Sequence, residues 1–207
     1  MSPDPRLDLL RAALHPLAAL PAGPCWNLEE LTGLLPEGEP REAAVLVGVV
    51  PRPGALQVLL TRRTDDLRHH AGQVSFPGGR IEPPDVDPVA AAIRETGEEV
   101  GIPPGQLAPL GYLDPLATIT GFRVWPVVAQ VDPAYVPRPD PREVAEVFEV
   151  PLADLLEPAN LVQRTIDVRG RPRRVLEFVN PISPERRIWG ATASILHNLR
   201  QRLEHAR

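Results

Sequence analysis

The 207-residue chain contains no lysine, a single cysteine (Cys25) and few aromatic side chains, which make up 4% of the residues. Its 22 arginines face 27 acidic residues, so the formal net charge is −5. This balance argues against DNA binding through a basic surface. One cysteine excludes an intrachain disulfide framework, and no Cys/His cluster indicates structural zinc.

Long apolar runs are also missing. No stretch approaches the roughly 18 apolar residues of a membrane span. The first 20 residues contain Asp4, Asp8 and several prolines and lack the basic start and apolar run of a signal peptide. We therefore expect a cytoplasmic protein that does not associate with membranes. The apolar fraction of 43% is ordinary for a globular chain, and 207 residues suit a single domain over 1–207.

Helical periodicity marks both ends of the chain. Leucines at helical spacing predict a helix over 5–20, and Asn27 is expected to cap a second helix through residue 35. Residues 1–36 are thus interpreted as a helical extension. A long C-terminal helix is predicted over 189–205. Four of its residues are expected to point inward: Ile195, Leu196, Leu199 and Leu203.

The middle of the chain alternates between predicted strands and one strong helix. The expected strands are 43–50, 56–62, 73–76, 107–113, 123–131, 143–150, 161–168 and 173–179, with a short helix at 151–156. The strong helix covers 88–100, with Asp87 as N-cap, Pro88 in the first turn and Gly101 after the end. This order predicts a mixed α/β sandwich.

Three glutamates crowd one face of the predicted helix over 88–100. At 100° per residue, Glu95, Glu98 and Glu99 share a face. Two like charges roughly 4 Å apart repel by about 4 kcal/mol at an effective dielectric near 20. Such a trio alone is typical of a solvated helix face. However, it follows "FPGGR", where the glycine backbone can approach a ligand, and Mg²⁺ or Mn²⁺ prefers carboxylate oxygens.

The segment "GGRIEPPDVDPVAAAIRETGEEVGI" resembles a Nudix box, whose usual form is G-x5-E-x7-R-E-U-x-E-E-x-G-U with U apolar. The matching residues are Arg94, Glu95, Glu98, Glu99, Gly101 and Ile102. Thr96 replaces an aliphatic residue, Asp85 replaces the first glutamate, and one extra residue precedes Arg94. The resemblance implies a Nudix-type α/β/α sandwich with a mixed β-sheet between helices.

The preceding segment "LLTRRTDDLRHHAGQVSFPGG" resembles the additional motif of coenzyme A diphosphatases, roughly L-L-T-x-R-[SA]-x3-R-x3-G-x3-F-P-G-G. The residues in register are Leu59, Leu60, Thr61, Arg63, Arg68, Gly72, Phe76, Pro77, Gly78 and Gly79. Thr64 stands where a smaller residue is usual. Together the two motifs cover 59–102.

These resemblances imply metal-dependent hydrolysis of the diphosphate of coenzyme A to 3′,5′-ADP and 4′-phosphopantetheine. Mg²⁺ or Mn²⁺ would be held by Glu95, Glu98 and Glu99. Arg94 would orient a neighbouring glutamate.

The substrate side of the predicted site depends on the additional motif. Arg63 and Arg68 are expected to bind phosphate, and Gly78 and Gly79 to approach the substrate closely. The other arginines of this part of the chain, Arg52, Arg62 and Arg80, are expected to be surface residues.

The base that takes the proton from water is left open. The candidates are Glu98 and Glu143, with Glu146 as a fallback. Glu143 and Glu146 could equally be exposed charges at a strand end. Phe122 and Trp125 are interpreted as core residues. The alternative is that they contact the adenine or the pantetheine of the substrate.

Two other functions remain open. The same catalytic residues would serve a Nudix hydrolase of another nucleoside diphosphate derivative, such as ADP-ribose. A non-catalytic, nucleotide-sensing Nudix domain is the second alternative. The expected partner is a small-molecule substrate, coenzyme A or a derivative, and a homodimer is left open.

Overall fold

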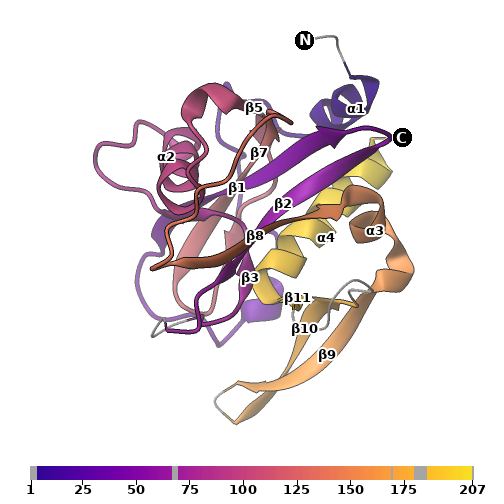
Figure 1. The fold of residues 1–207 in the computed structure, drawn as a ribbon. Helices are drawn as coiled ribbons and strands as arrows, with labels where there is room; N and C mark the ends of the chain where they lie inside the picture. The colour runs from indigo at the N-terminus through magenta and orange to yellow at the C-terminus, as the bar shows by residue number, and fades with distance from the viewer. Residues whose placement is uncertain (1–3, 67–69, 169, 180–185, 207) are drawn as a thin grey trace.

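Eight strands form one mixed sheet in the computed structural model, which describes residues 4–66, 70–168, 170–179 and 186–206 (Figure 1). They are β1 (Arg41–Arg52), β2 (Ala55–Arg63), β3 (Val74–Ser75), β4 (Gly78–Arg80), β5 (Leu107–Tyr112), β6 (Leu116–Ala117), β7 (Phe122–Val131) and β8 (Val144–Pro151). A second, three-stranded sheet contains β9 (Leu161–Val168), β10 (Arg171–Phe178) and β11 (Ile188–Trp189).

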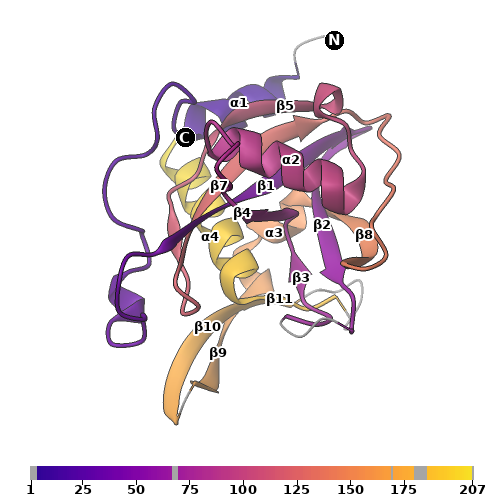
Figure 2. The ribbon, with the colours of Figure 1, turned by 90° about the vertical axis from the view of Figure 1, so that its left-hand side faces the viewer.

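Four α-helices surround the strands within the described residues. They are α1 (Pro5–Ala13), α2 (Pro88–Val100), α3 (Leu152–Leu156) and α4 (Gly190–His205). Single 3₁₀ turns are η1 (Glu29–Leu31), η2 (Pro104–Gln106) and η3 (Pro158–Asn160). Figure 2 shows α2 in front of the sheet and α4 behind it.

The sheet opens into a fork at its centre. β1 and β2 form a hairpin but pair only near its turn, between Val49–Arg52 and Ala55–Val58. Beyond that point β3 pairs with β2 and β4 pairs with β1, so β4 lies inside the sheet. β7 runs parallel to β1 on its other side, whereas the remaining pairings are antiparallel. The fork places the partly buried Gly78 and Gly79 in the middle of the sheet, beside β1.

Each face of the sheet has its own apolar core. On the α2 face, Ala44 and Leu46 of β1 pack in one cluster with Ala91 and Ala92 of α2. On the opposite face, here the α4 face, the cluster joins β1 to α1, α3 and α4. It includes Leu10, Val47, Val49, Leu152, Leu196 and Leu199. Alternation along β1 thus buries both faces, and the predicted α/β/α sandwich with a mixed sheet is confirmed.

The helix α2 has the bounds predicted from the sequence. The Asp87 side chain accepts a hydrogen bond of 2.7 Å from Ala90 N–H, and Gly101 ends the helix with φ of 73°. Thr96 is fully buried, and its hydroxyl donates to the Ala92 carbonyl at 2.7 Å. This bond satisfies the only polar atom of a side chain that replaces the usual aliphatic one.

The N-terminal predictions are partly wrong. Helix α1 ends at Ala13, well before residue 20, because Leu14 is extended and His15 exchanges two backbone hydrogen bonds of 2.9 Å with Tyr112. Pro16 also disfavours helical backbone at His15. Asn27 does not cap a helix. Its buried side-chain amide bonds both N–H and C=O of Ala117 at 2.9 Å, and only the turn η1 follows.

The C-terminal predictions are largely confirmed. The β9–β10 hairpin forms, and the four residues expected to face inward from α4 are buried. The helix begins at Gly190, because Trp189 belongs to β11, which was not predicted. A two-residue strand is too short to show a hydrophobic period.

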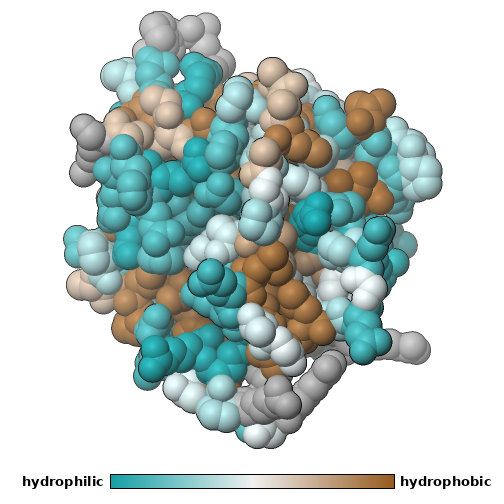
Figure 3. Space-filling model, turned by 180° about the vertical axis from the view of Figure 1, so that it is seen from behind, coloured by the Kyte–Doolittle hydropathy of each residue, from teal (hydrophilic) through white to brown (hydrophobic). Residues whose placement is uncertain are grey.

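The surface of the molecule is mixed in character. Seen from behind, hydrophilic side chains separate its hydrophobic patches (Figure 3). Exposed large apolar side chains include Leu20, Val86 and Val136. Throughout the part of the chain that the structure describes, every helix is too short or too polar to span a lipid bilayer.

Candidate active site

The glycines of β4 bring backbone against the glutamates of α2. Gly78 N–H donates a 3.0 Å hydrogen bond to Glu99 Oε2. A Cβ atom added to Gly79 would lie 2.5 Å from Cδ and 2.7 Å from Oε2 of Glu95. Both distances are shorter than a non-bonded contact allows, so a larger residue at this position would displace the Glu95 carboxylate.

Glu99 is the most buried of the three glutamates, with 5% of its surface exposed. Besides Gly78, its carboxylate accepts a bond of 3.3 Å from Nη1 of Arg63 on β2. Burial raises the Glu99 pKa to about 7, although the bond from Gly78 and the charge of Arg63 oppose the shift. Burial likewise raises the Glu95 pKa. The site therefore holds negative charge at an energetic cost that a cation would offset.

Arg94 connects the acidic side chains of the site to one another. Its five N–H donors form five hydrogen bonds: Nε and Nη2 to Asp85, Nη1 to Glu95 and Glu98, and Nη2 to the Arg80 carbonyl, at 2.9–3.1 Å. The guanidinium therefore has no donor left for a substrate. This geometry agrees with the predicted role of orienting a neighbouring glutamate.

Asp85 is a site residue to which the sequence assigned no role. Its carboxylate receives two bonds from Arg94 and one of 2.8 Å from Glu82 N–H. The bonds from Arg94 are the largest of the effects that lower the Asp85 pKa. The sequence did contain a signal for this contact, which is the departure from the usual Nudix box. Aspartate replaces glutamate at position 85, and the loop before Arg94 is one residue longer, so the two changes occur together.

Glu143 lies at the turn before β8. Its Oε2 is 3.8 Å from Arg63 Nη2, and its side chain is half-exposed. The negative charge of Glu143 contributes to the raised pKa of both Glu95 and Glu99, so the three carboxylates are neighbours. Glu146, the fallback base, forms an ion pair with Arg186 instead.

The loop between β7 and β8 is fastened to the end of α2. Arg138 N–H donates to the Val100 carbonyl at 2.7 Å, and Asp140 N–H donates to the Glu99 carbonyl at 3.0 Å. The Asp140 carbonyl then accepts from Glu143 N–H at 3.0 Å. Backbone bonds thus connect the residue that carries one candidate base with the helix that carries the glutamates.

Most of the predicted site residues are brought together. Arg63, Gly78, Gly79, Arg94, Glu95, Glu99 and Glu143 surround one region, with Glu98 at its more exposed edge. Arg68 lies outside the described residues. Trp125 is buried and donates to Glu42 at 2.6 Å, which confirms its interpretation as a core residue, whereas Phe122 is half-buried.

The donor types fit a hard divalent cation, since all the candidate ligands are carboxylate oxygens. Within the described residues, however, no three Asp, Glu, His or Cys side chains converge closely enough to hold a metal ion. Arginines bond one oxygen of each carboxylate: Arg63 bonds Oε1 of Glu99, and Arg94 bonds Oε1 of Glu95 and Oε2 of Glu98. To hold one metal ion, the carboxylates of Glu95, Glu98 and Glu99 would have to turn and converge. The predicted ligand set therefore remains a prediction.

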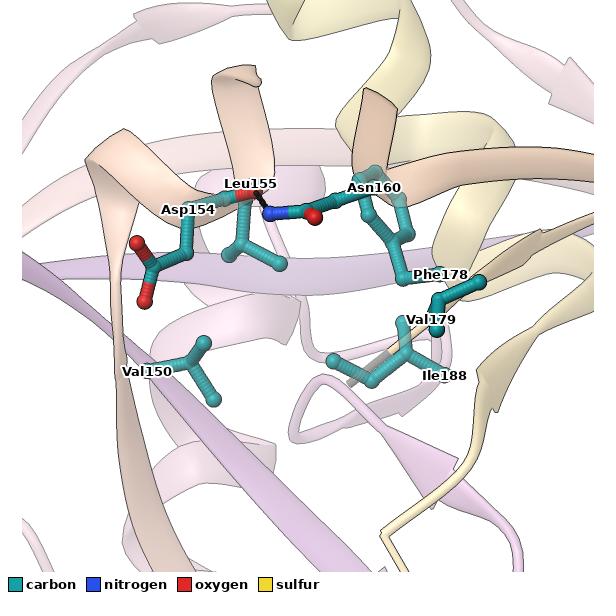
Figure 4. A pocket seen from close by; sticks show the side chains of 7 residues that line it. All are labelled: Val150, Asp154, Leu155, Asn160, Phe178, Val179 and Ile188. Carbon is teal, nitrogen blue, oxygen red and sulfur yellow. Dashed lines mark hydrogen bonds between the residues drawn. The ribbon is translucent and has the colours of Figure 1, made fainter. Parts of the chain in front are cut away.

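A pocket elsewhere in the fold contains none of these residues. It lies between α3, β10 and β11 and is lined by Val150, Asp154, Leu155, Asn160, Phe178, Val179 and Ile188 (Figure 4). The Asn160 side chain donates to the Asp154 carbonyl at 2.9 Å. The lining is mostly apolar and offers no charge cluster for a diphosphate.

The raised Glu99 pKa predicts how stability depends on pH in metal-free protein. Between pH 4.5 and about 7 the folded state holds a proton that the unfolded state releases, so the free energy of unfolding falls as pH rises through this window. The expected decrease is about 3 kcal/mol. Urea unfolding in EDTA at pH 5 and pH 7.5 measures it, with Glu99→Gln as control. Equal pH dependence in both proteins would contradict the prediction.

Comparison with known proteins shows to which family the chain belongs. A family model described as the NUDIX domain matches residues 39–168, a range that includes every predicted site residue. A protein from Photorhabdus laumondii named "Uncharacterized Nudix hydrolase NudL" is 40% identical over 164 residues, which cover 79% of this chain and 86% of the relative. A protein of the same name from Salmonella paratyphi B is 43% identical over 162 residues, covering 77% of this chain and 81% of the relative.

Among solved structures, a MutT/nudix family protein from Enterococcus faecalis superposes with a TM-score of 0.50 at 17% identity. The match covers 99% of this chain and 76% of that one. At this identity the likeness shows the fold alone. The family match and the relatives go further, since the NUDIX model spans 39–168 and the two relatives are 40% and 43% identical over more than three quarters of this chain. The chain belongs to the Nudix hydrolases, enzymes that act on pyrophosphate bonds.

Proposed function

We propose that this Nudix hydrolase cleaves the diphosphate of coenzyme A, and of its derivatives, to 3′,5′-ADP and 4′-phosphopantetheine. The observation that carries the proposal is the position of the motif over 59–79, which resembles that of coenzyme A diphosphatases. Its first part forms β2 and its last part β3 and β4, so it leads directly into the cluster of carboxylates. Arg63 of this motif contacts Glu99.

The glutamates of α2 are the proposed metal ligands. A divalent cation, Mg²⁺ or Mn²⁺, would be held by Glu95, Glu98 and Glu99 and would supply charge neutralisation and an activated water. The chain itself positions these groups. Gly78 N–H holds Glu99, and Arg94 holds Glu95 and Glu98.

We assign Glu143 as the group that takes the proton from water. Glu98 bonds Arg94, and Glu146 is paired with Arg186, whereas the only ion pair of Glu143 within the described residues is the 3.8 Å approach to Arg63. A substrate phosphate that drew Arg63 away would leave the Glu143 carboxylate free to accept a proton.

Arg63 has a second proposed task, which is to contact the phosphates together with Arg68. A forked guanidinium suits this role because it can bond two phosphate oxygens at once. The cytoplasmic location and the homodimer considered from the sequence remain predictions.

Product analysis tests the proposed function. Coenzyme A and ADP-ribose are incubated separately with the protein and Mg²⁺ or Mn²⁺, and the products are identified by mass spectrometry. We expect 3′,5′-ADP and 4′-phosphopantetheine, with a higher kcat/KM for coenzyme A than for ADP-ribose. Equal or faster turnover of ADP-ribose would favour the alternative substrate class. Nucleotide binding without turnover of either compound would favour a sensing domain.

A further inference from the structure

Two arginines flank the ring of Phe122 at the end of the sheet. The Arg41 guanidinium carbon lies 4.0 Å from the ring centroid, and that of Arg80 lies 5.6 Å from it. Strand register explains the arrangement. Phe122 of β7 is opposite Arg41 of β1, and Arg80 of β4 is opposite Ala43, which shares a face with Arg41. The small Ala43 side chain leaves room for Arg80 to reach across β1.

Neither guanidinium pairs with a carboxylate within the described residues. Arg41 Nη2 donates a hydrogen bond of 2.8 Å to the Thr120 carbonyl. This bond fixes the Arg41 guanidinium without neutralising its charge. Arg123 of the neighbouring position provides the contrast, since it stacks 5.9 Å over Trp125 and lies 3.7 Å from the Glu42 carboxylate. Two uncompensated positive charges on one ring, in a chain of net charge −5, form a site for an anion.

The geometry of the pair suits phosphate. A guanidinium that lies over a ring can still donate through its other N–H groups, here all but one of the donors of Arg41, and a pair of such donors matches two oxygens of a phosphate group. Arg63 does not serve this additional group, because it lies beside Glu99 and Glu143, where its proposed partner is the diphosphate. Both Arg41 and Arg80 are exposed, whereas Phe122 is half-buried and serves as a fixed platform.

The arginine pair adjoins the catalytic cluster. Arg80 directly follows Gly79, so their Cα atoms are about 3.8 Å apart. The Arg80 carbonyl accepts a 3.1 Å hydrogen bond from Arg94, which also bonds Glu95 and Glu98. Because successive strand residues point to opposite faces, Gly79 faces Glu95 and Arg80 faces Phe122. The arginine pair is therefore on the α4 face and Glu95 on the α2 face, so a substrate held at both would have to pass around the end of β4.

We propose that Arg41 and Arg80, held on Phe122, bind a phosphomonoester group of the substrate that is separate from the diphosphate under attack. The proposal rests on the proposed function, in which this group is the 3′-phosphate of coenzyme A. Arg80 thereby becomes a specificity residue instead of the ordinary surface arginine expected from the sequence. Substrates with the same diphosphate but no phosphomonoester gain nothing from the pair.

Calorimetry tests the site without turnover. Binding of 3′,5′-ADP is compared with binding of 5′-AMP, which lacks only the 3′-phosphate. The wild type is expected to bind 3′,5′-ADP about 10- to 100-fold more tightly, as two charge-assisted contacts allow. In Arg41→Gln/Arg80→Gln the preference is expected to fall to about twofold or less. Each single variant is expected to lose part of the preference.

Arg123→Gln is the matched control, because Arg123 is also stacked on an aromatic ring but is paired with Glu42. It is expected to keep the full preference for 3′,5′-ADP. The proposal is overturned if the wild type shows no preference, if the double variant keeps it, or if Arg123→Gln loses it equally.

Kinetics separates this proposal from the proposed function. The ratio of kcat/KM for coenzyme A over 3′-dephospho-coenzyme A is expected to be about 10 or more in the wild type and near one in the double variant. A ratio that the double variant leaves unchanged would overturn the subsite. If coenzyme A is not hydrolysed while the nucleotide preference still depends on both arginines, the proposed function fails and the phosphate site stands.

Discussion

Replacing Glu99 with glutamine is expected to lower kcat/KM for the diphosphate substrate by on the order of 10³-fold. Glutamine keeps the shape of the side chain but removes the charge that a divalent cation would meet. It also removes the anionic partner of Arg63, whereas the amide oxygen of glutamine can still accept the hydrogen bond from Gly78 N–H. Steady-state kinetics at saturating Mg²⁺ measures the effect, and titration of Mn²⁺ measures the accompanying loss of metal affinity.

Glu146→Gln is the matched control for this experiment. Glu146 lies on β8 near the cluster, but its carboxylate pairs with Arg186. We expect this variant to keep activity within about threefold of wild type, since a partly exposed ion pair contributes little. Near-wild-type activity in Glu99→Gln would contradict the metal site.

Gly78→Ala is expected to lower the free energy of unfolding by about 4 kcal/mol or more. Gly78 has φ of 156°, and its added Cβ would overlap the Ala44 carbonyl and lie 2.6 Å from Val45 Cα. The strand cannot easily withdraw, because the Pro77 carbonyl accepts from Leu46 N–H at 2.9 Å. Since whole domains are stable by only about 5–15 kcal/mol, much of this variant should be unfolded at 37 °C.

The control is Gly97→Ala, on the same helix as Glu95, Glu98 and Glu99. A Cβ there meets nothing closer than the Ile102 carbonyl at 3.6 Å, and alanine favours helix over glycine by up to about 1 kcal/mol. Urea unfolding should therefore show unchanged or increased stability for Gly97→Ala. A loss below about 1 kcal/mol in Gly78→Ala would mean that β4 can move away from β1.

The elements that were predictable carry their own local signals. Helix α2 has a capping aspartate, a first-turn proline and a terminal glycine within its own segment, and its bounds agree with the prediction. Asn27 carries a capping signal too, but the backbone of Ala117, 90 residues away, takes its side chain. The residues near Asn27 in the sequence could not reveal that its side chain would bond a distant strand.

The candidate site divides in the same way. The three glutamates and the two glycines belong to short motifs and could be found from spacing. The bond from Arg94 to Asp85 depends on the path of an irregular loop. The stack of Arg41, Phe122 and Arg80 depends on the register of three strands, which the sequence does not display.

The bonds between the β7–β8 loop and the end of α2 have a dynamic consequence. Two carbonyls in the last turn of α2 find their partners in Arg138 and Asp140 N–H, not in water. If the loop opened, these carbonyls would lose their donors, and the turn that carries Glu99 would fray with it. The loop and the helix end should therefore open and close as one cooperative unit. Motion at the candidate base would then disorder the helix turn that carries Glu99, a proposed metal ligand, so we expect catalytically competent molecules to have both segments closed.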